Sequence, residues 1–64
     1  MVNLTEREID VLRCVTAGYE NKEIGLELYI SIHTVKAHIS SIIKKLNARN
    51  RANAVFIACK NNII

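Results

Sequence analysis

The hydrophobic residues of this chain recur at helical spacing in four successive segments. Short stretches of small polar residues separate these segments. Proline is absent, and the only glycines in the sequence are Gly18 and Gly25. A pattern of this kind is typical of a small helical protein. We predict an all-α, four-helix domain over residues 1–64, with helices at 6–17, 21–28, 32–46 and 51–60.

The first helix carries start and stop signals in the sequence. Thr5 and Glu8 have the spacing of a capping box, and Leu4 and Ile9 can form a hydrophobic staple across it. Gly18 supplies the left-handed residue that often ends a helix.

A short second helix, a tight turn and a longer third helix form a helix-turn-helix candidate over residues 20–39. Asn21 and Ser31 are predicted to cap these two helices. Gly25 lies inside the second helix, where glycine costs about 0.5–1 kcal/mol relative to alanine. We interpret it as a point where another backbone comes close, which would let the third helix pack on the second. A neutral surface glycine is the alternative.

The third helix has two distinct faces. Hydrophobic residues at positions 35, 39, 42 and 46 fall on one side and predict a core stripe. The opposite side is basic and made largely of short residues: His33, Lys36, Ala37, Ser40 and Lys44. A helix fits the DNA major groove when its outward residues are short near the base edges and cationic near the phosphates.

The charge distribution also indicates a polyanionic partner. Residues 1–30 hold three basic and six acidic side chains, a net charge of −3, whereas residues 31–64 hold six basic side chains and no acid, a net charge of +6. A basic half of this kind favours nucleic acid. A solvated lysine face is the alternative.

The outward face of the third helix suggests a role for each residue. Lys36 can donate to guanine O6 and N7, Ser40 can pair with several bases, and Ala37 can contact a thymine methyl group. The residues suited to phosphates are Thr34, Ser41, Lys44 and Lys45, together with outward-facing His33. The face has no Arg, Asn or Gln, so we expect modest specificity from one monomer.

The fourth helix is apolar all the way round between residues 54 and 59, so it must bury more than one face. One face can pack on the first helix, and the other is then free for a homodimer in which Val55, Phe56 and Cys59 form the interface. A dimer would place two recognition helices about 34–36 Å apart, one turn of DNA. The alternative is that the core wraps this helix completely.

Other classes of function lack the residues they need. His33 and His38 are five positions apart and do not share a helix face, so we expect no metal site. Cys14 and Cys59 are interpreted as small hydrophobes. The chain has no Gly-rich phosphate loop and no nucleophile beside an activator, so we expect neither an enzyme nor a cofactor.

The longest apolar run is six residues, too short to span a membrane, and Met1 is not followed by a signal-peptide pattern. We therefore expect no membrane partner and a cytoplasmic location.

Four short motifs together resemble the LuxR/GerE-type DNA-binding domain of bacterial transcription regulators. They are LTERE at residues 4–8, NKEI at 21–24, TVKAH at 34–38 and KL at 45–46. The resemblance covers residues 4–60 and implies a tetra-helical helix-turn-helix fold. It further implies sequence-specific binding of double-stranded DNA, with the fourth helix dimerising.

The resemblance also implies roles for single residues. The lysine of the TVK motif and the positions one and four after it contact bases in this family, which here are Lys36, Ala37 and Ser40. The residues that match the family's phosphate contacts are Asn21, Lys22, Ser31 and Thr34. The operator, the regulated genes, activation or repression, and any upstream signal are not encoded in these motifs.

Two alternatives remain at this level. The chain could be a small protein-interaction module or adaptor that uses its apolar fourth helix, or a promoter-recognition element that needs RNA polymerase as partner. One structural hypothesis concerns Glu8 and Arg51, each near a helix start beside core residues, which we predict to form an ion pair.

Overall fold

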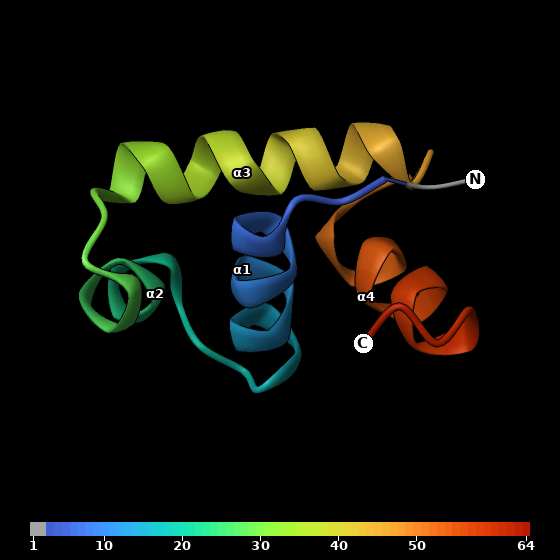
Figure 1. Cartoon of the computed structure of the whole chain (residues 1–64), viewed down its shortest axis with the longest axis horizontal. Helices are drawn as coiled ribbons and strands as arrows, with labels where there is room; N and C mark the ends of the chain where they lie inside the picture. Colours follow the sequence, from blue (N-terminus) through green and yellow to red (C-terminus); the bar gives the residue numbers. More distant parts are fainter. Residues whose placement is uncertain (1–2) are drawn as a thin grey trace.

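The computed structural model describes residues 3–64 and has the predicted all-α fold (Figure 1). The helices are α1 (Glu6–Thr16), α2 (Asn21–Leu28), α3 (Ile32–Lys45) and α4 (Arg51–Lys60). Both ends of α2 and α4 agree with the prediction, while α1 and α3 each end one residue earlier than expected. Within residues 3–64, no helix is long and apolar enough to cross a membrane.

Helix α3 lies along one side of the molecule and contacts all three other helices (Figure 1). Helix α1 packs beneath its middle, α2 lies beside its N-terminal end, and α4 lies beside its C-terminal end. All four helices contribute to one core: Val11, Leu12, Ile24, Val35, Ile42, Leu46, Ala54 and Ala58 are buried. This arrangement leaves the side of α3 opposite the core open to solvent.

Three of the predicted helix starts are confirmed in detail. The Thr5 N–H donates to Glu8 Oε1 at 2.8 Å and the Glu8 N–H donates to Thr5 Oγ1 at 3.1 Å, a complete capping box. Ser31 caps α3 and Asn50 caps α4 through their side-chain oxygens.

The predicted cap of α2 is wrong by one residue. Asn21 is the first residue of the helix, and Glu20 is the N-cap. The Glu20 N–H donates to Glu23 Oε1 at 2.8 Å, so a backbone donor at this start is satisfied by a glutamate three residues on.

Gly25 does sit where another backbone comes close. A Cβ built on it would lie 2.7 Å from the carbonyl oxygen of Ile30, and the Ile30 N–H donates to the Gly25 carbonyl at 3.0 Å. We expected the close backbone to be that of α3. The nearest atom instead belongs to the turn between α2 and α3. Tyr29 completes this turn in the left-handed conformation, with φ of 59°.

The predicted ion pair between Glu8 and Arg51 is wrong. Arg51 Nη2 donates to the Tyr19 carbonyl at 3.0 Å, and Arg51 Nη1 donates to Asn21 Oδ1. Arg51 thus joins the start of α4 to the loop before α2 and to the first residue of α2. The carboxylate of Glu8 instead points to α3.

Candidate nucleic-acid interface

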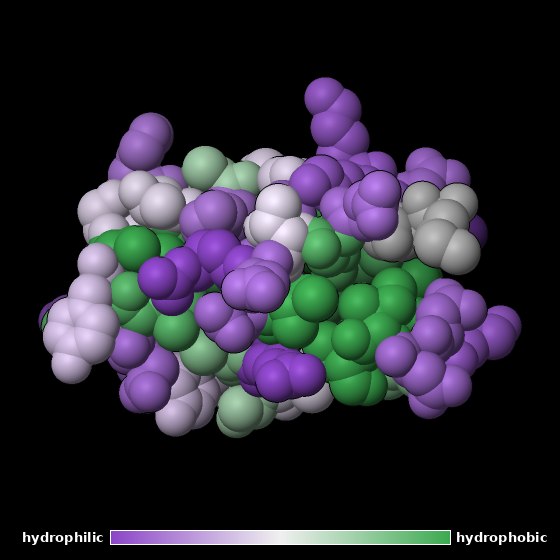
Figure 2. Space-filling model, in the orientation of Figure 1, coloured by the Kyte–Doolittle hydropathy of each residue, from purple (hydrophilic) through white to green (hydrophobic). Residues whose placement is uncertain are grey.

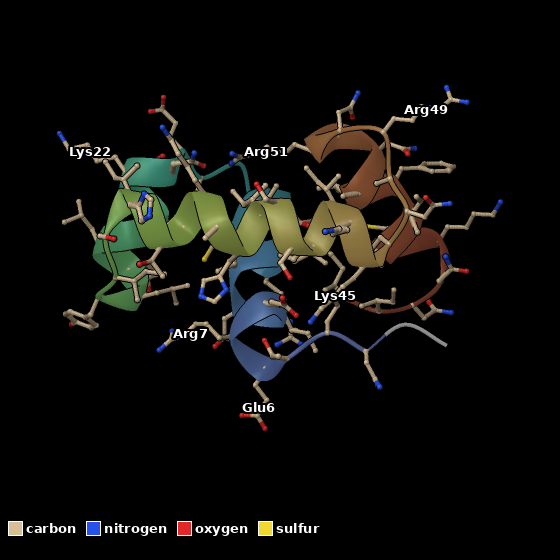
Figure 3. All side chains as sticks on the ribbon, turned by 90° about the horizontal axis from the view of Figure 1, so that it is seen from above. Glu6, Arg7, Lys22, Lys45, Arg49 and Arg51 are labelled. Atoms are coloured by element: carbon tan, nitrogen blue, oxygen red, sulfur yellow. The ribbon has the colours of Figure 1, made fainter. Side chains whose placement is uncertain are left out.

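The outward face of α3 is exposed along the length of the helix. The predicted outward residues His33, Lys36, Ala37, Ser40 and Lys44 are all exposed, while Val35 and Ile42 on the opposite side are buried. Figure 3 views the molecule from above this face, with α3 running across the front. The helix therefore presents the short and basic side chains that the sequence pattern predicted.

The N-terminal end of α3 carries two hydroxyl groups that bond to each other and to the first turn of the helix. Ser31 Oγ accepts from the Thr34 N–H at 3.0 Å and donates to Thr34 Oγ1 at 3.0 Å. Ser31 is exposed and Thr34 is half-buried. A helix N-terminus combines free N–H groups with the positive end of the helix dipole, so this end suits an anion.

The start of α2 adds an exposed lysine and an amide group that is already hydrogen-bonded. Lys22 is exposed and projects beyond the side of α3 in Figure 3. Asn21 is half-buried, and its Oδ1 accepts from Arg51. The amide nitrogen of Asn21 is a further hydrogen-bond donor.

Glu8 is the buried charged residue of the core, at 4% exposure. Burial alone would raise the pKa of its carboxyl group, but hydrogen bonds from Lys45, Ser41 and the Thr5 N–H, with the positive charge of Lys45, lower the pKa to about 2. Ser41 Oγ donates to Glu8 Oε2 at 2.6 Å, and Lys45 Nζ donates to Glu8 Oε1 at 2.8 Å. Glu8 is therefore an anion that joins α1 to α3.

Two of the predicted phosphate contacts thus have partners inside the protein. Ser41 is half-buried, and the side chain of Lys45 is 37% exposed. Figure 3 shows Lys45 pointing to the side of α3 on which α1 begins. The charge of Lys45 is largely compensated by Glu8, unlike the charge of Lys44.

Arg49 is a charged residue that the sequence analysis did not assign. It is exposed, lies in the connection between α3 and α4, and makes no ion pair within the described residues. The acid-free stretch of residues 31–64 is the sequence signal that could have identified it.

Helix α4 is only partly covered by the core. Ala54 and Ala58 are buried, Val55 is half-buried, Phe56 is 62% exposed and Cys59 is exposed. The alternative in which the core wraps α4 completely is therefore wrong. Figure 2 shows apolar side chains gathered on the surface around α4 and the C-terminal end of the chain.

Both cysteines are free thiols. Cys14 is half-buried, and burial raises its pKa, with a smaller contribution from the negative charges of Glu27 and Asp10. The thiol of Cys14 is accordingly a poor nucleophile.

Comparison with known proteins identifies the family. A family model described as "Bacterial regulatory proteins, luxR family" (GerE) matches residues 2–58. The chain therefore belongs to the LuxR family of bacterial regulatory proteins, and its all-α fold is that of a helix-turn-helix domain. Membership of a family of regulatory proteins also favours the expectation that the chain is not an enzyme.

Several relatives and solved structures are similar to the chain. The response regulator protein VraR of Staphylococcus aureus is 44% identical over 61 residues, which are 95% of this chain and 29% of VraR. VraR of Staphylococcus epidermidis gives the same values. The chain thus spans less than a third of the length of these curated relatives.

Two solved structures share the fold. The structure of the transcription factor GerE superposes with a TM-score of 0.88 at 34% identity, covering 92% of this chain and 88% of GerE. The crystal structure of the response regulator ChrA in a heme-sensing two-component system gives a TM-score of 0.93 at 34% identity, covering all of this chain and 32% of ChrA.

Proposed function

We propose that residues 1–64 act as one cytoplasmic DNA-binding domain of a bacterial transcription regulator, with its helix-turn-helix motif at residues 20–39. In this proposal α3 enters the major groove of double-stranded DNA, and two copies bind as a homodimer through α4. The observation that carries it is the outward face of α3, whose residues are exposed, short or basic, and free of acidic side chains.

Three residues in the middle of this face are assigned to bases. Lys36, Ala37 and Ser40 are exposed and lie within two turns of the same helix, so all three can reach base edges at once. Lys36 donates to guanine, Ser40 bonds to one of several bases, and Ala37 contacts a thymine methyl group. None of these contacts is bidentate through a planar group, so a single domain discriminates weakly and a dimer is needed for a long site.

The residues assigned to phosphates lie around these three. They are Asn21, Lys22, Ser31, His33, Thr34 and Lys44. Ser41 and Lys45 are left out of this set because their polar atoms bond to Glu8. Moving either side chain to a phosphate would leave a buried carboxylate with fewer partners, which is costly.

The apolar surface of α4 supports a dimer. Phe56 is a large hydrophobic side chain with most of its area in water, and Val55 and Cys59 lie beside it on the helix. Covering such a patch with a second copy removes apolar area from water at about 25 cal/mol per Å².

Selection of bound duplexes from a random DNA pool by the purified chain tests the function directly. We expect enrichment of one motif with two-fold symmetry, with half-sites about 10 bp apart. A pool that stays random at moderate salt would contradict sequence-specific binding.

A second candidate function is a protein-interaction module that acts through α4, favoured by the 62% exposure of Phe56. It predicts a dimer or complex that forms through Phe56 while the chain ignores DNA even at low salt. Sedimentation of the wild type and Phe56→Ala, with and without a duplex, separates this candidate from the first.

A further inference from the structure

The two ends of α3 differ in how they can hold a phosphate. The N-terminal end has the positive end of the helix dipole, and the first N–H groups of a helix lack partners within the helix. The C-terminal end has the negative end of the dipole, so a phosphate there requires cations. Lys44 and Lys45 occupy this last turn, but Lys45 Nζ lies 2.8 Å from Glu8 Oε1. Lys44 makes no ion pair with any residue from 3 to 64, so its charge stays uncompensated within that range.

Arg49 lies just beyond this end and has a well-fixed backbone. The Arg49 N–H donates to Asn53 Oδ1 at 3.0 Å, and the preceding Ala48 N–H donates to the Ile43 carbonyl at 2.9 Å. These two bonds tie the connection to α4 on one side and to α3 on the other. The backbone from which the exposed side chain of Arg49 extends is consequently held in place by hydrogen bonds.

Arg49 and Arg7 lie on opposite sides of α3 when the molecule is viewed from above that helix (Figure 3). Arg7 is also a surface arginine, with its side chain 46% exposed, but its Nη1 is 3.9 Å from Asp10 Oδ2. For Arg49, no such acidic neighbour exists among residues 3–64. The two arginines carry the same charge, so they form a matched pair for an experiment.

We propose that Arg49 and Lys44 together bind a phosphate of the DNA backbone at the C-terminal end of α3. The N-terminal end of α3 then contacts the phosphates of one DNA strand, and the C-terminal end contacts those of the other. Helix α3 has 14 residues and is therefore about 21 Å long. The major groove is about 12 Å wide, so both ends of such a helix can reach a phosphate backbone. The fork of an arginine binds phosphate through two parallel hydrogen bonds, which a lysine cannot do. This inference rests on the proposed function.

The test is the salt dependence of DNA binding by the wild type, Arg49→Ala and Arg7→Ala, measured by fluorescence anisotropy with the selected duplex and with an unrelated one. Each lost phosphate contact lowers the slope of log affinity against log salt by about 0.9, equivalent to about an 8-fold loss of affinity at 0.1 M salt. We expect this change for Arg49→Ala on both duplexes. Arg7→Ala should leave slope and affinity unchanged, although it removes the same charge.

Two outcomes overturn the inference. In the first, Arg49→Ala keeps the wild-type salt slope, so Arg49 binds no phosphate. In the second, Arg49→Ala and Arg7→Ala lose the same amount of slope and affinity, so Arg49 contributes only through the net charge of the protein. In either case Lys36→Ala still reports on the proposed function, because its loss should be confined to the selected duplex. If the wild type binds neither duplex, the proposed function fails and this inference fails with it.

Discussion

The outward face of α3 and the contact between α1 and α3 around Glu8 use the same residue types in opposite ways. Lys44 and Lys45 are neighbours in sequence, and so are Ser40 and Ser41. The first residue of each pair is exposed on the outward face. The second residue of each pair bonds to Glu8.

The difference arises because successive residues of an α-helix point about 100° apart. That rotation is enough to turn Lys45 and Ser41 toward α1 while Lys44 and Ser40 stay in solvent. The number of lysines on α3 therefore overstates the positive charge that its outward face presents. What matters is which cations are already compensated inside the protein.

The largest expected effect comes from breaking the contact around Glu8. Glu8→Ala removes the acceptor of Ser41, Lys45 and the Thr5 N–H, and we expect a loss of about 2–4 kcal/mol in the free energy of unfolding. Urea unfolding followed by circular dichroism measures it. Glu6→Ala, two residues before Glu8 and exposed, is the control and should change stability by less than about 0.5 kcal/mol.

On the outward face, Lys36→Ala should act on recognition and not on folding. We expect the affinity for the selected duplex to fall by about 1–3 kcal/mol, with a much smaller change for unrelated DNA and an unchanged unfolding midpoint. Anisotropy titrations against both duplexes measure the two affinities. An equal loss on both duplexes would move Lys36 from the bases to the phosphates.

The periodic pattern and the cap signals were sufficient to predict the four helices. Hydrophobic spacing is a local property, and so are the capping boxes and the αL residue at Gly18, with φ of 91°. The cap of α2 was predicted wrongly by one position, because Asn21 is of a residue type that usually caps a helix and Glu20 is not.

Contacts between helices were harder to predict because they join residues far apart in sequence. Glu8 bonds to side chains 33 and 37 positions away, and Arg51 bonds to an amide 30 positions away. A helical wheel gives the direction of a side chain but not the partner that it meets. The exposed face of α3 was predictable because exposure to solvent follows from the direction of a side chain alone and requires no knowledge of a contacting residue.

Helix α4 shows the same limit in an apolar segment. Its sequence is apolar on every side, so the pattern could not say which side the core would cover. The structure buries the small Ala54 and Ala58 and leaves the large Phe56 outside. Val55 and Ile57 also pack partly against the core, so the direction of each side chain, and not its size or hydrophobicity, decides what is buried.

Substituting Lys44 and Lys45 one at a time separates the lysine of the outward face from the lysine that is bound to Glu8. Lys44→Ala should weaken binding to all DNA by about 5- to 10-fold at 0.1 M salt and reduce the salt slope by about 0.9. Lys45→Met should leave that slope nearly unchanged but lower the stability of the fold. If both variants reduced the salt slope by the same amount, DNA would have to displace Lys45 from Glu8.

The smallest expected effect is on the pH dependence of folding. The pKa of Glu8 falls from 4.5 to about 2 in the folded protein. Between these values the unfolded chain binds more protons, so stability falls as the pH falls. We expect Glu8 to account for a loss of about 0.5–1 kcal/mol between pH 5 and pH 4. The measurement is the stability difference between the wild type and Glu8→Gln at each pH, which cancels the titration of the other carboxylates. This difference should shrink as the pH is lowered, and a constant difference would show that Glu8 titrates alike in both states.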